Sequence, residues 1–289
     1  MLVLLAAGLG SRFGGIKPLA PVGPDHEPLL QLALGQAASA GFVEAVVVVT
    51  GGVSRATIES AVVGWSLEVT VVCAPQDGVG PAREKPWGTV AALLAAGRHA
   101  PGRDLVVANG DDLYGAEGLR RARAWPGAVS ERVPPVASAA PAVPADAALV
   151  AYRAARTLSP SGGVSRAVPV VDGSGRLAQL VEHRDVQRAD GSIHTAAGLT
   201  LSADDPVSMN LWVFRASAVD VIGSAFAEFL ADHGHDPAAE LGLPEAVGAL
   251  VRAGRLGVEL LVTDSPWHGV TWPADTERVR AELRAEAGR

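Results

Sequence analysis

The feature that most constrains the fold is a run of β-branched residues at 45–50, with the sequence AVVVVT. A strand that is apolar along its whole length is typical of parallel sheets, in which helices cover both faces. Helical apolar spacing precedes the run in Pro28–Gly41 and follows it in Ser54–Val63, and further strands are predicted at Met1–Leu5 and Leu67–Cys73. This alternation predicts a doubly wound α/β fold, which binds ligands at the carboxyl ends of its strands.

The first predicted strand ends in a glycine-rich loop that carries two basic residues. Glycines let backbone N–H groups approach an anion, because no Cβ blocks the approach. Arg12 adds a guanidinium fork and Lys17 adds a point charge, a combination suited to nucleotide phosphates. The glycine spacing is not that of a dinucleotide-binding motif, and Ile16 stands where a P-loop has its lysine.

The charge and the cysteine usage exclude several classes of protein. The chain has 289 residues and a formal net charge of -7, whereas general nucleic-acid binders and proteins that bind anionic membranes need a positive field. Cys73 is the single cysteine, which excludes an intrachain disulfide and fits a reducing compartment. No apolar run is long enough to span a membrane, and Met1–Leu5 is too short for a signal peptide. The sequence therefore predicts a cytoplasmic protein that binds neither nucleic acid nor membrane.

The segments LAAGLGSR at 5–12 and KPL at 17–19 resemble the signature of the sugar-nucleotidyltransferase family, L-A-A-G-x-G-[ST]-R followed by K-P-L. The resemblance implies a doubly wound, Rossmann-type sheet that is mixed and mostly parallel, with an acceptor-binding β-hairpin subdomain. It also implies transfer of a nucleoside monophosphate from a nucleoside triphosphate to a small phosphorylated acceptor, with release of pyrophosphate.

The resemblance divides the chain into two halves of one domain. Residues 1–124 form the nucleotide-binding half, and residues 149–289 form the acceptor-binding half. Residues 125–148, rich in Pro, Ala and Ser without apolar periodicity, are predicted to be a loop or linker with no chemistry.

In the nucleotide-binding half, the resemblance assigns Arg12 to the β- and γ-phosphates. It assigns Lys17 to the α-phosphate and the acceptor, and Asp111 to Mg²⁺; these three are the predicted catalytic residues. The residues predicted to bind the nucleotide are Leu5, Ala6, Ala7, Gly8, Gly10, Ser11, Arg12, Pro86, Trp87, Gly88, Thr89, Asn109 and Gly110.

Two of these residues, Gly88 and Thr89, open an alanine-rich helix, Val90–His99. Free N–H groups at a helix N-terminus can hold a base edge or a phosphate. The KPWGT segment at 85–89 is similar to one bacterial subgroup of nucleotidyltransferases. Trp87 has two interpretations, stacking on a ligand ring or ordinary packing.

The strand Asp104–Asn109 delivers Gly110, Asp111 and Asp112 at its carboxyl end. Adjacent carboxylates on a strand point to opposite faces, so both can reach one ion only if the chain turns, which Gly110 permits. By resemblance Asp111 is the magnesium ligand, and Asp112 is interpreted as a supporting group. The second metal-binding aspartate of the family is missing, and Glu240 is the best substitute.

The acceptor side is predicted on a hairpin whose turn is DGSG at 172–175, preceded by Arg166 and followed by a strand at Leu177–Glu182. The resemblance assigns Arg166, Glu182 and Asn210 to the acceptor. His183 and Arg184 stand where the family has a lysine, and His183 is either a surface residue or part of that altered contact. A buried amide needs partners, so Asn210 is either bonded within the sheet or facing the ligand.

Three functions remain open. The first is a sugar-1-phosphate nucleotidyltransferase, and the second is a cytidylyltransferase for a phospho-alcohol or a phosphonate, which the altered acceptor side favours. The third is a non-catalytic nucleotide-sugar sensor. The cluster His233, His235 and Asp236 has two further interpretations, a metal site or a capped loop, of which the loop is favoured. The sequence is compatible with an oligomer.

Overall fold

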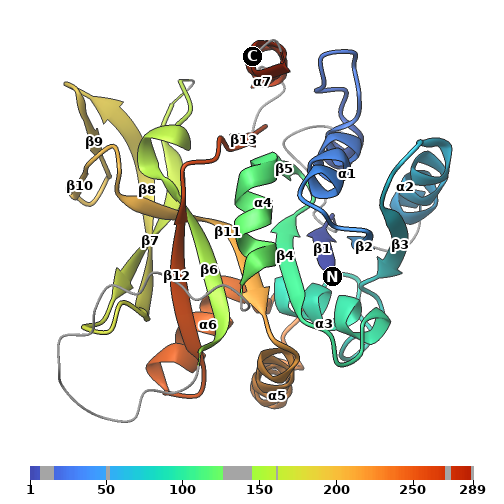
Figure 1. The fold of residues 1–289 in the computed structure, drawn as a ribbon. Coiled ribbons are helices and arrows are strands. Elements are labelled where there is room, and N and C mark those ends of the chain that lie inside the picture. The colour runs from blue at the N-terminus through green and yellow to red at the C-terminus, as the bar shows by residue number, and fades with distance from the viewer. Residues whose placement is uncertain (7–15, 50–52, 126–144, 161, 271–274, 288–289) are drawn as a thin grey trace.

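The computed structural model describes residues 1–6, 16–49, 53–125, 145–160, 162–270 and 275–287, and it has one large mixed sheet with helices on both faces (Figure 1). The centre of the sheet has the order β4-β1-β2-β3, and all its pairings are parallel. Its strands are β1 (Leu2–Leu5), β2 (Glu44–Val49), β3 (Thr70–Pro75) and β4 (Leu105–Asn109). The predicted α/β fold with a doubly wound, mixed sheet is confirmed.

Antiparallel strands extend this sheet on the side of β4. Strand β11 pairs with β4, β6 and β7, while β12 lies parallel to β6, and β8, β9 and β10 follow outward from β7. The strands are β6 (Ala145–Arg153), β7 (Val164–Val171), β8 (Leu177–Ala189), β9 (Ser192–His194), β10 (Thr200–Leu201), β11 (Pro206–Phe214) and β12 (Gly257–Thr263). The extension is the part of the chain that carries the predicted acceptor-binding residues.

Helices pack on both faces of the sheet and bury one apolar cluster on each. On one face Leu34 and Leu119 join the cluster from α1 and α4, and on the other Leu93 and Ile222 join from α3 and α5. The helices are α1 (Leu29–Ser39), α2 (Val53–Gly64), α3 (Thr89–His99), α4 (Gly115–Ala124), α5 (Ala216–His233), α6 (Leu243–Arg252) and α7 (Asp275–Ala287), with short 3-10 helices η1 (Lys17–Leu19) and η2 (Ala154–Arg156). In the described part of the chain, none of these helices combines the length and apolarity that crossing a membrane requires.

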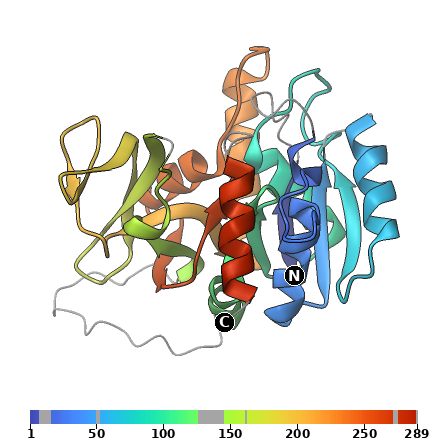
Figure 2. The ribbon, with the colours of Figure 1, turned by 90° about the horizontal axis from the view of Figure 1, so that it is seen from above.

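A small second sheet and the last helix connect the two ends of the chain. Strand β5 (Asp112–Leu113) pairs with β13 (His268–Gly269), and α7 lies between the extension and the parallel strands when the molecule is seen from above (Figure 2). Arg280 of α7 donates from Nε to the carbonyl of Gly23, 3.1 Å away. The C-terminal helix α7 therefore packs against the segment around Gly23, near the start of the chain.

Three predictions of secondary structure need correction. The predicted loop at 125–148 ends earlier, because Ala145 already begins β6, which pairs with both β11 and β12; residues 126–144 lie outside the described part. Strand β8 does not end at Glu182 but runs to Ala189, because β9 pairs with its last residues. Helix α5 was not predicted, although its buried positions Ala218, Ile222 and Phe226 follow a four-residue spacing.

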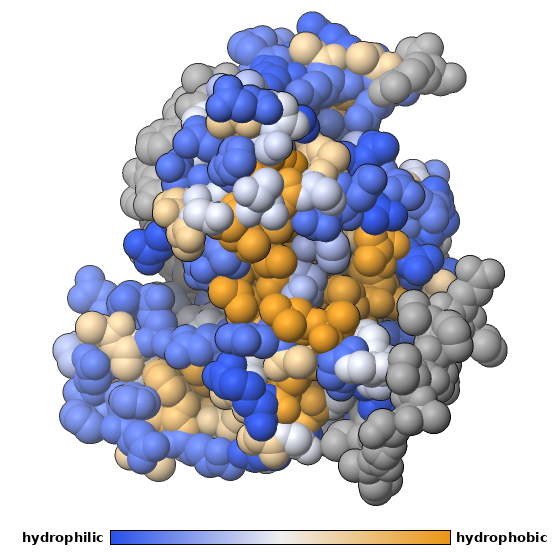
Figure 3. Space-filling model, turned by 90° about the vertical axis from the view of Figure 1, so that its left-hand side faces the viewer, coloured by the Kyte–Doolittle hydropathy of each residue, from blue (hydrophilic) through white to orange (hydrophobic). Residues whose placement is uncertain are grey.

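The side of the molecule formed by the extension gathers apolar side chains between two mainly hydrophilic parts (Figure 3).

Candidate active site

Two cavities open at the carboxyl ends of the central strands. The first, here called the α3 cavity, has a volume of about 430 Å³ and includes the ends of β1, β3 and β4 and the start of α3. The second, here called the β11 cavity, has a volume of about 690 Å³ and lies between β7, β8, β11 and α6. The position agrees with the rule that doubly wound sheets bind ligands at the carboxyl ends of their strands.

Three side chains, those of Lys17, Asn109 and Asp111, line both cavities. Lys17 Nζ lies 2.7 Å from Asp111 Oδ2, and the Lys17 side chain is 15% exposed. Lys17 comes from η1, just after the glycine-rich loop, while Asn109 and Asp111 follow β4. The ion pair therefore stands where the two cavities meet.

A turn at Gly110 and Asp111 lies between β4 and β5, and the two aspartates have different surroundings. A Cβ on Gly110 would lie 3.0 Å from the Cβ of Ala6, so glycine lets the ends of β1 and β4 come close together. The Gly110 N–H donates to the carbonyl of Leu5 at 2.9 Å. Asp111 consequently faces both cavities, whereas Asp112 begins β5 and is only 8% exposed.

Asp112 is a buried carboxyl group at the edge of the β11 cavity. Asn109 donates from Nδ2 to its Oδ2 at 2.9 Å. Burial, together with the neighbouring charge of Asp111, raises the pKa of Asp112 to about 7, although Lys17, Asn109 and Arg166 offset part of the effect. Such a group is placed to hold the Asn109 amide rather than to carry a full charge in the cavity.

The segment Pro86–Thr89 lines the α3 cavity except for Trp87. Gly88 has a φ of +97°, and a Cβ there would lie 2.5 Å from the carbonyl oxygen of Leu241, so the close approach of these two chains requires glycine. Leu241 N–H donates to the Trp87 carbonyl, and the Leu241 carbonyl accepts from Val90 N–H. The start of α3 is therefore partly occupied by protein contacts, contrary to the free N–H groups that the sequence suggested.

Trp87 takes the packing interpretation, and its assignment to nucleotide stacking is corrected. Its side chain is 4% exposed, its Nε1 donates to the carbonyl of Pro81 at 2.9 Å, and its ring meets Phe229 edge-on. Arg83 covers the ring at 4.0 Å from the centroid. Among the described residues, these contacts bury the Trp87 ring.

Arg166 is the basic residue on the far wall of the β11 cavity. Its guanidinium donates to the carbonyls of Ser165 and Thr157, lies over the ring of Trp267, and has a buried Nε without a partner. Among the described residues, no carboxylate lies within 4 Å of it. Burial lowers the pKa of Arg166 to about 10, which the charge of Asp112 partly offsets. A guanidinium in this setting lacks a counter-ion that an anionic ligand can provide.

The other predicted acceptor residues, Glu182 and Asn210, line the same cavity. Asn210 has a φ of +61° and sits in a bulge of β11, where the register with β6 shifts between Ser208 and Leu211. Its N–H donates to Ser208 Oγ at 3.2 Å. The bulge turns Asn210 out of the ladder and onto the cavity wall.

His183 and Arg184, which stand where the family has a lysine, are not among the described residues that line the β11 cavity. Arg166 lies opposite His183 in the β7–β8 register. The cation on this wall therefore comes from β7 rather than from the hairpin strand β8.

A metal could be held by carboxylates of the α3 cavity. Asp111 and Glu240 both line it, and Glu240 also pairs with Lys85 at 3.0 Å. Among the described residues there is no group of three or more His, Cys, Asp or Glu side chains of the kind that encloses a metal ion. One or two carboxylates completed by substrate phosphates are the usual donors for Mg²⁺, and this donor set fits that pattern.

The cluster of His233, His235 and Asp236 agrees with the capped-loop interpretation, because Asp236 Oδ1 accepts from Ala238 N–H at 2.8 Å within the loop.

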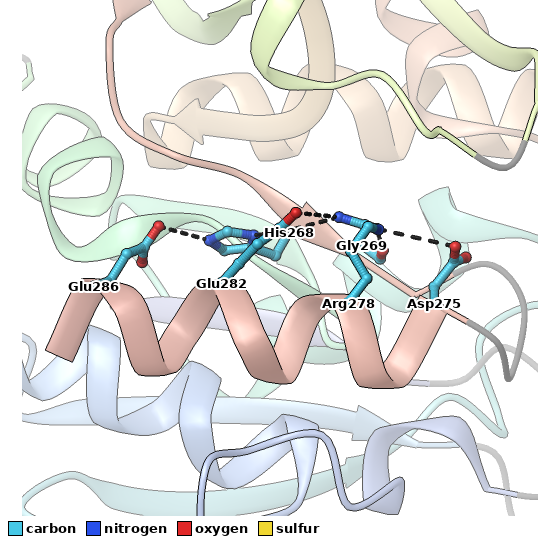
Figure 4. Close-up of polar contacts among 6 residues, drawn as sticks. All are labelled: His268, Gly269, Asp275, Arg278, Glu282 and Glu286. Carbon is cyan, nitrogen blue, oxygen red and sulfur yellow. Dashed lines mark hydrogen bonds and ion pairs between the residues drawn. The ribbon is translucent and has the colours of Figure 1, made fainter. Parts of the chain in front are cut away.

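The wall that carries Trp267 is fixed by α7. His268, next to Trp267, lies with Nδ1 2.9 Å from Glu282 and Nε2 3.0 Å from Glu286, and Arg278 pairs with Glu282 at 2.9 Å (Figure 4). Since His268 belongs to β13, which pairs with the strand of Asp112, this network holds the edge of the β11 cavity.

Sequence reasoning missed several residues that line these cavities, among them Gln76, Arg252 and Trp267. Gln76 in the α3 cavity donates from Nε2 to the Gly88 carbonyl at 2.7 Å, and its position after β3 was the available signal. Arg252 of α6 and Trp267 line the β11 cavity. Their positions depend on tertiary packing, for which the sequence carries no local signal.

Five predicted residues lie outside the described residues: Ala7, Gly8, Gly10, Ser11 and Arg12.

A central parallel sheet with two cavities joined by a lysine–aspartate pair is the arrangement of a nucleotidyltransferase, and comparison with known proteins supports this class. Residues 2–157 match the family model of the MobA-like NTP transferase domain. The chain belongs to this family. It is also similar in structure to a protein from Bacillus anthracis, described as a glucose-1-phosphate thymidylyltransferase in complex with a sucrose, with a TM-score of 0.63. The two share 13% identity over 98% of this chain and 94% of the other, which shows a common fold. The comparison with curated proteins gave no match.

Proposed function

We propose that this nucleotidyltransferase transfers a nucleoside monophosphate from a nucleoside triphosphate to a sugar-1-phosphate and releases pyrophosphate. The observation that carries the proposal is the Lys17–Asp111 pair, which lines both cavities at once. In this proposal the triphosphate occupies the α3 cavity and the acceptor occupies the β11 cavity. The reacting atoms then meet at the pair.

In the proposed reaction an oxygen of the acceptor phosphate attacks the α-phosphorus. A new P–O bond forms, the bond between the α-phosphorus and the bridging oxygen breaks, and pyrophosphate takes the electron pair. Such a displacement depends on positioning and on stabilising negative charge more than on a protein nucleophile. Lys17 is a fixed positive charge at the place where this charge develops. Arg12, assigned by resemblance, would hold the β- and γ-phosphates.

Mg²⁺ would be held by Asp111, with Glu240 as the second carboxylate, and when bound it neutralises phosphate charge. Asp111 also keeps Lys17 in place through the 2.7 Å contact. Lys17 thus has a partner that fixes its position before substrate arrives.

The acceptor is proposed to lie against the wall formed by Arg166, Glu182 and Asn210. An anionic group of the acceptor would provide the counter-ion that Arg166 lacks, while the carboxylate of Glu182 and the amide of Asn210 suit hydroxyl groups. This combination of one cation with polar oxygen acceptors supports a phosphorylated polyol such as a sugar. The base of the nucleotide, the cytoplasmic location and an oligomeric state stay predictions from the sequence.

The experiment is pyrophosphate release with Mg²⁺ across ATP, CTP, GTP, UTP and dTTP, each paired with sugar-1-phosphates, phospho-alcohols and phosphonates. Lys17→Ala should lose about 10²–10³-fold in kcat, the cost of removing one donor to a developing charge. Arg255→Ala is the control, because Arg255 is an exposed residue paired with Glu228 away from both cavities.

Turnover of a sugar-1-phosphate that is lost in Lys17→Ala and kept in Arg255→Ala supports the proposal. Turnover of CTP with a phospho-alcohol or phosphonate alone would replace the sugar with that acceptor class. Nucleotide binding by calorimetry without pyrophosphate release from any pair would contradict transfer and favour the non-catalytic sensor.

A further inference from the structure

Strand β11 changes its partner along one edge at the β11 cavity. Residues Trp212–Phe214 pair with β4, whereas Ser208 pairs with Ala167 of β7. Continuing the β4 register beyond Trp212 would place Asn210 opposite Asn109, but the ladder stops before them. The sheet therefore divides beside Asn109, which lines both cavities, and Asn210, which lines the β11 cavity.

The hydroxyl of Tyr114 occupies this division. It accepts from Asn109 N–H at 3.1 Å and donates to the carbonyl of Met209 at 2.7 Å. The Asn109 N–H is a main-chain group of β4 that a continued ladder would have used for pairing with β11. One side-chain hydroxyl thus replaces a ladder contact and keeps the two strands apart.

Tyr114 is buried, and its main-chain carbonyl has two hydrogen-bond partners. It is 2% exposed, and its carbonyl accepts from Tyr152 Oη at 2.7 Å and from Ser265 Oγ at 3.1 Å. Burial raises the pKa of Tyr114 well above its ordinary value, so the hydroxyl keeps the proton that it donates to Met209. Tyr114 lines neither cavity and does not reach a substrate.

We infer that Tyr114 is a positioning residue that sets the separation between the nucleotide side and the acceptor side through Asn109 and the Met209–Asn210 bulge. The inference rests on the proposed nucleotidyl transfer. In-line displacement needs two bound molecules at a fixed distance, and an error of about 1 Å between them costs on the order of 10²-fold in rate. Without the hydroxyl, β4 and β11 are free to approach or to separate further.

The test is Tyr114→Phe, which retains the ring that packs against Tyr152 with 6.1 Å between centroids. Tyr152→Phe is the matched control: it also removes one buried hydroxyl, and the carbonyl that it served keeps its contact with Ser265. Steady-state kinetics with both substrates varied, and urea unfolding, are measured for both variants and the wild type.

We expect Tyr114→Phe to lower kcat at least about tenfold relative to Tyr152→Phe, with both KM values within about threefold of the wild type. Equal kcat in the two variants, or a change confined to KM, would overturn the inference while leaving the transfer reaction intact. Failure of the wild type to turn over any substrate pair would instead overturn the proposed function, and the inference with it.

Discussion

Asp112 offers a quantitative test of the electrostatics at the base of the site. The group is 8% exposed, and burial raises its pKa from 3.8 to about 7. Between these values the folded state holds a proton that the unfolded state has lost, so the contribution of Asp112 to stability falls as pH rises through this window. The whole shift corresponds to at most about 4 kcal/mol, at about 1.4 kcal/mol for each pH unit.

The variant Asp112→Asn removes the titration and keeps the shape, and its amide oxygen still accepts from Asn109 Nδ2. The unfolding free energy of the variant minus that of the wild type should therefore increase by about 2 kcal/mol when the pH is raised from 5.5 to 8.0. The assay is urea unfolding at both pH values in metal-free buffer. Tyr152→Phe, which changes no carboxyl group, is the control and should lose the same amount at both.

A difference between Asp112→Asn and the wild type that stays constant with pH would refute this reasoning. It would mean that Asp112 is ionised in the folded protein at both pH values. The folded protein would then stabilise the ionised Asp112 carboxylate by interactions other than the hydrogen bond from Asn109.

Three further predictions follow from the cavity walls. Trp87→Phe should lower the unfolding free energy by about 1–2 kcal/mol, because the contact with Pro81 is lost, and leave the nucleotide Kd unchanged; weaker binding at unchanged stability would contradict the packing role. Gly88→Ala should lower stability and weaken nucleotide binding, because a Cβ would lie 2.5 Å from the Leu241 carbonyl, and wild-type values for both would disprove the close approach. Arg166→Ala should raise the acceptor KM about tenfold or more without changing the nucleotide KM, and an unchanged acceptor KM would remove Arg166 from that wall.

The sequence was most informative where one segment determines its own structure. The four valines of Val46–Val49 predicted a strand buried on both faces, and β2 has this form. The turn that Gly110 was expected to permit is present after β4, because glycine allows the close approach to Ala6. Lys17, Asp111, Arg166, Glu182 and Asn210 were chosen in part from a family signature, and the fold brings them to adjoining cavities.

What the sequence did not predict depends on contacts between distant residues. Trp87 is buried by Phe229 and Arg83, and Phe229 lies in a helix, α5, that was not predicted. The contact of Tyr114 with Met209 joins residues 95 positions apart, and no local pattern marks it. Strand β8 extends beyond its expected end because β9 offers a partner, which a single-strand pattern does not reveal.

The pairing of β5 with β13 has a consequence for how the protein is made. Asp112 lies on a two-residue strand whose partner, Gly269, follows more than 150 residues later, and the network of His268 with α7 comes later still. During synthesis from the N-terminus, Lys17 and Asp111 emerge long before the residues that pair with β5 and pack against β13. A growing chain therefore contains this ion pair before the walls of the β11 cavity are complete. Assembly of the site becomes one of the last steps of folding, coupled to docking of the C-terminal helix.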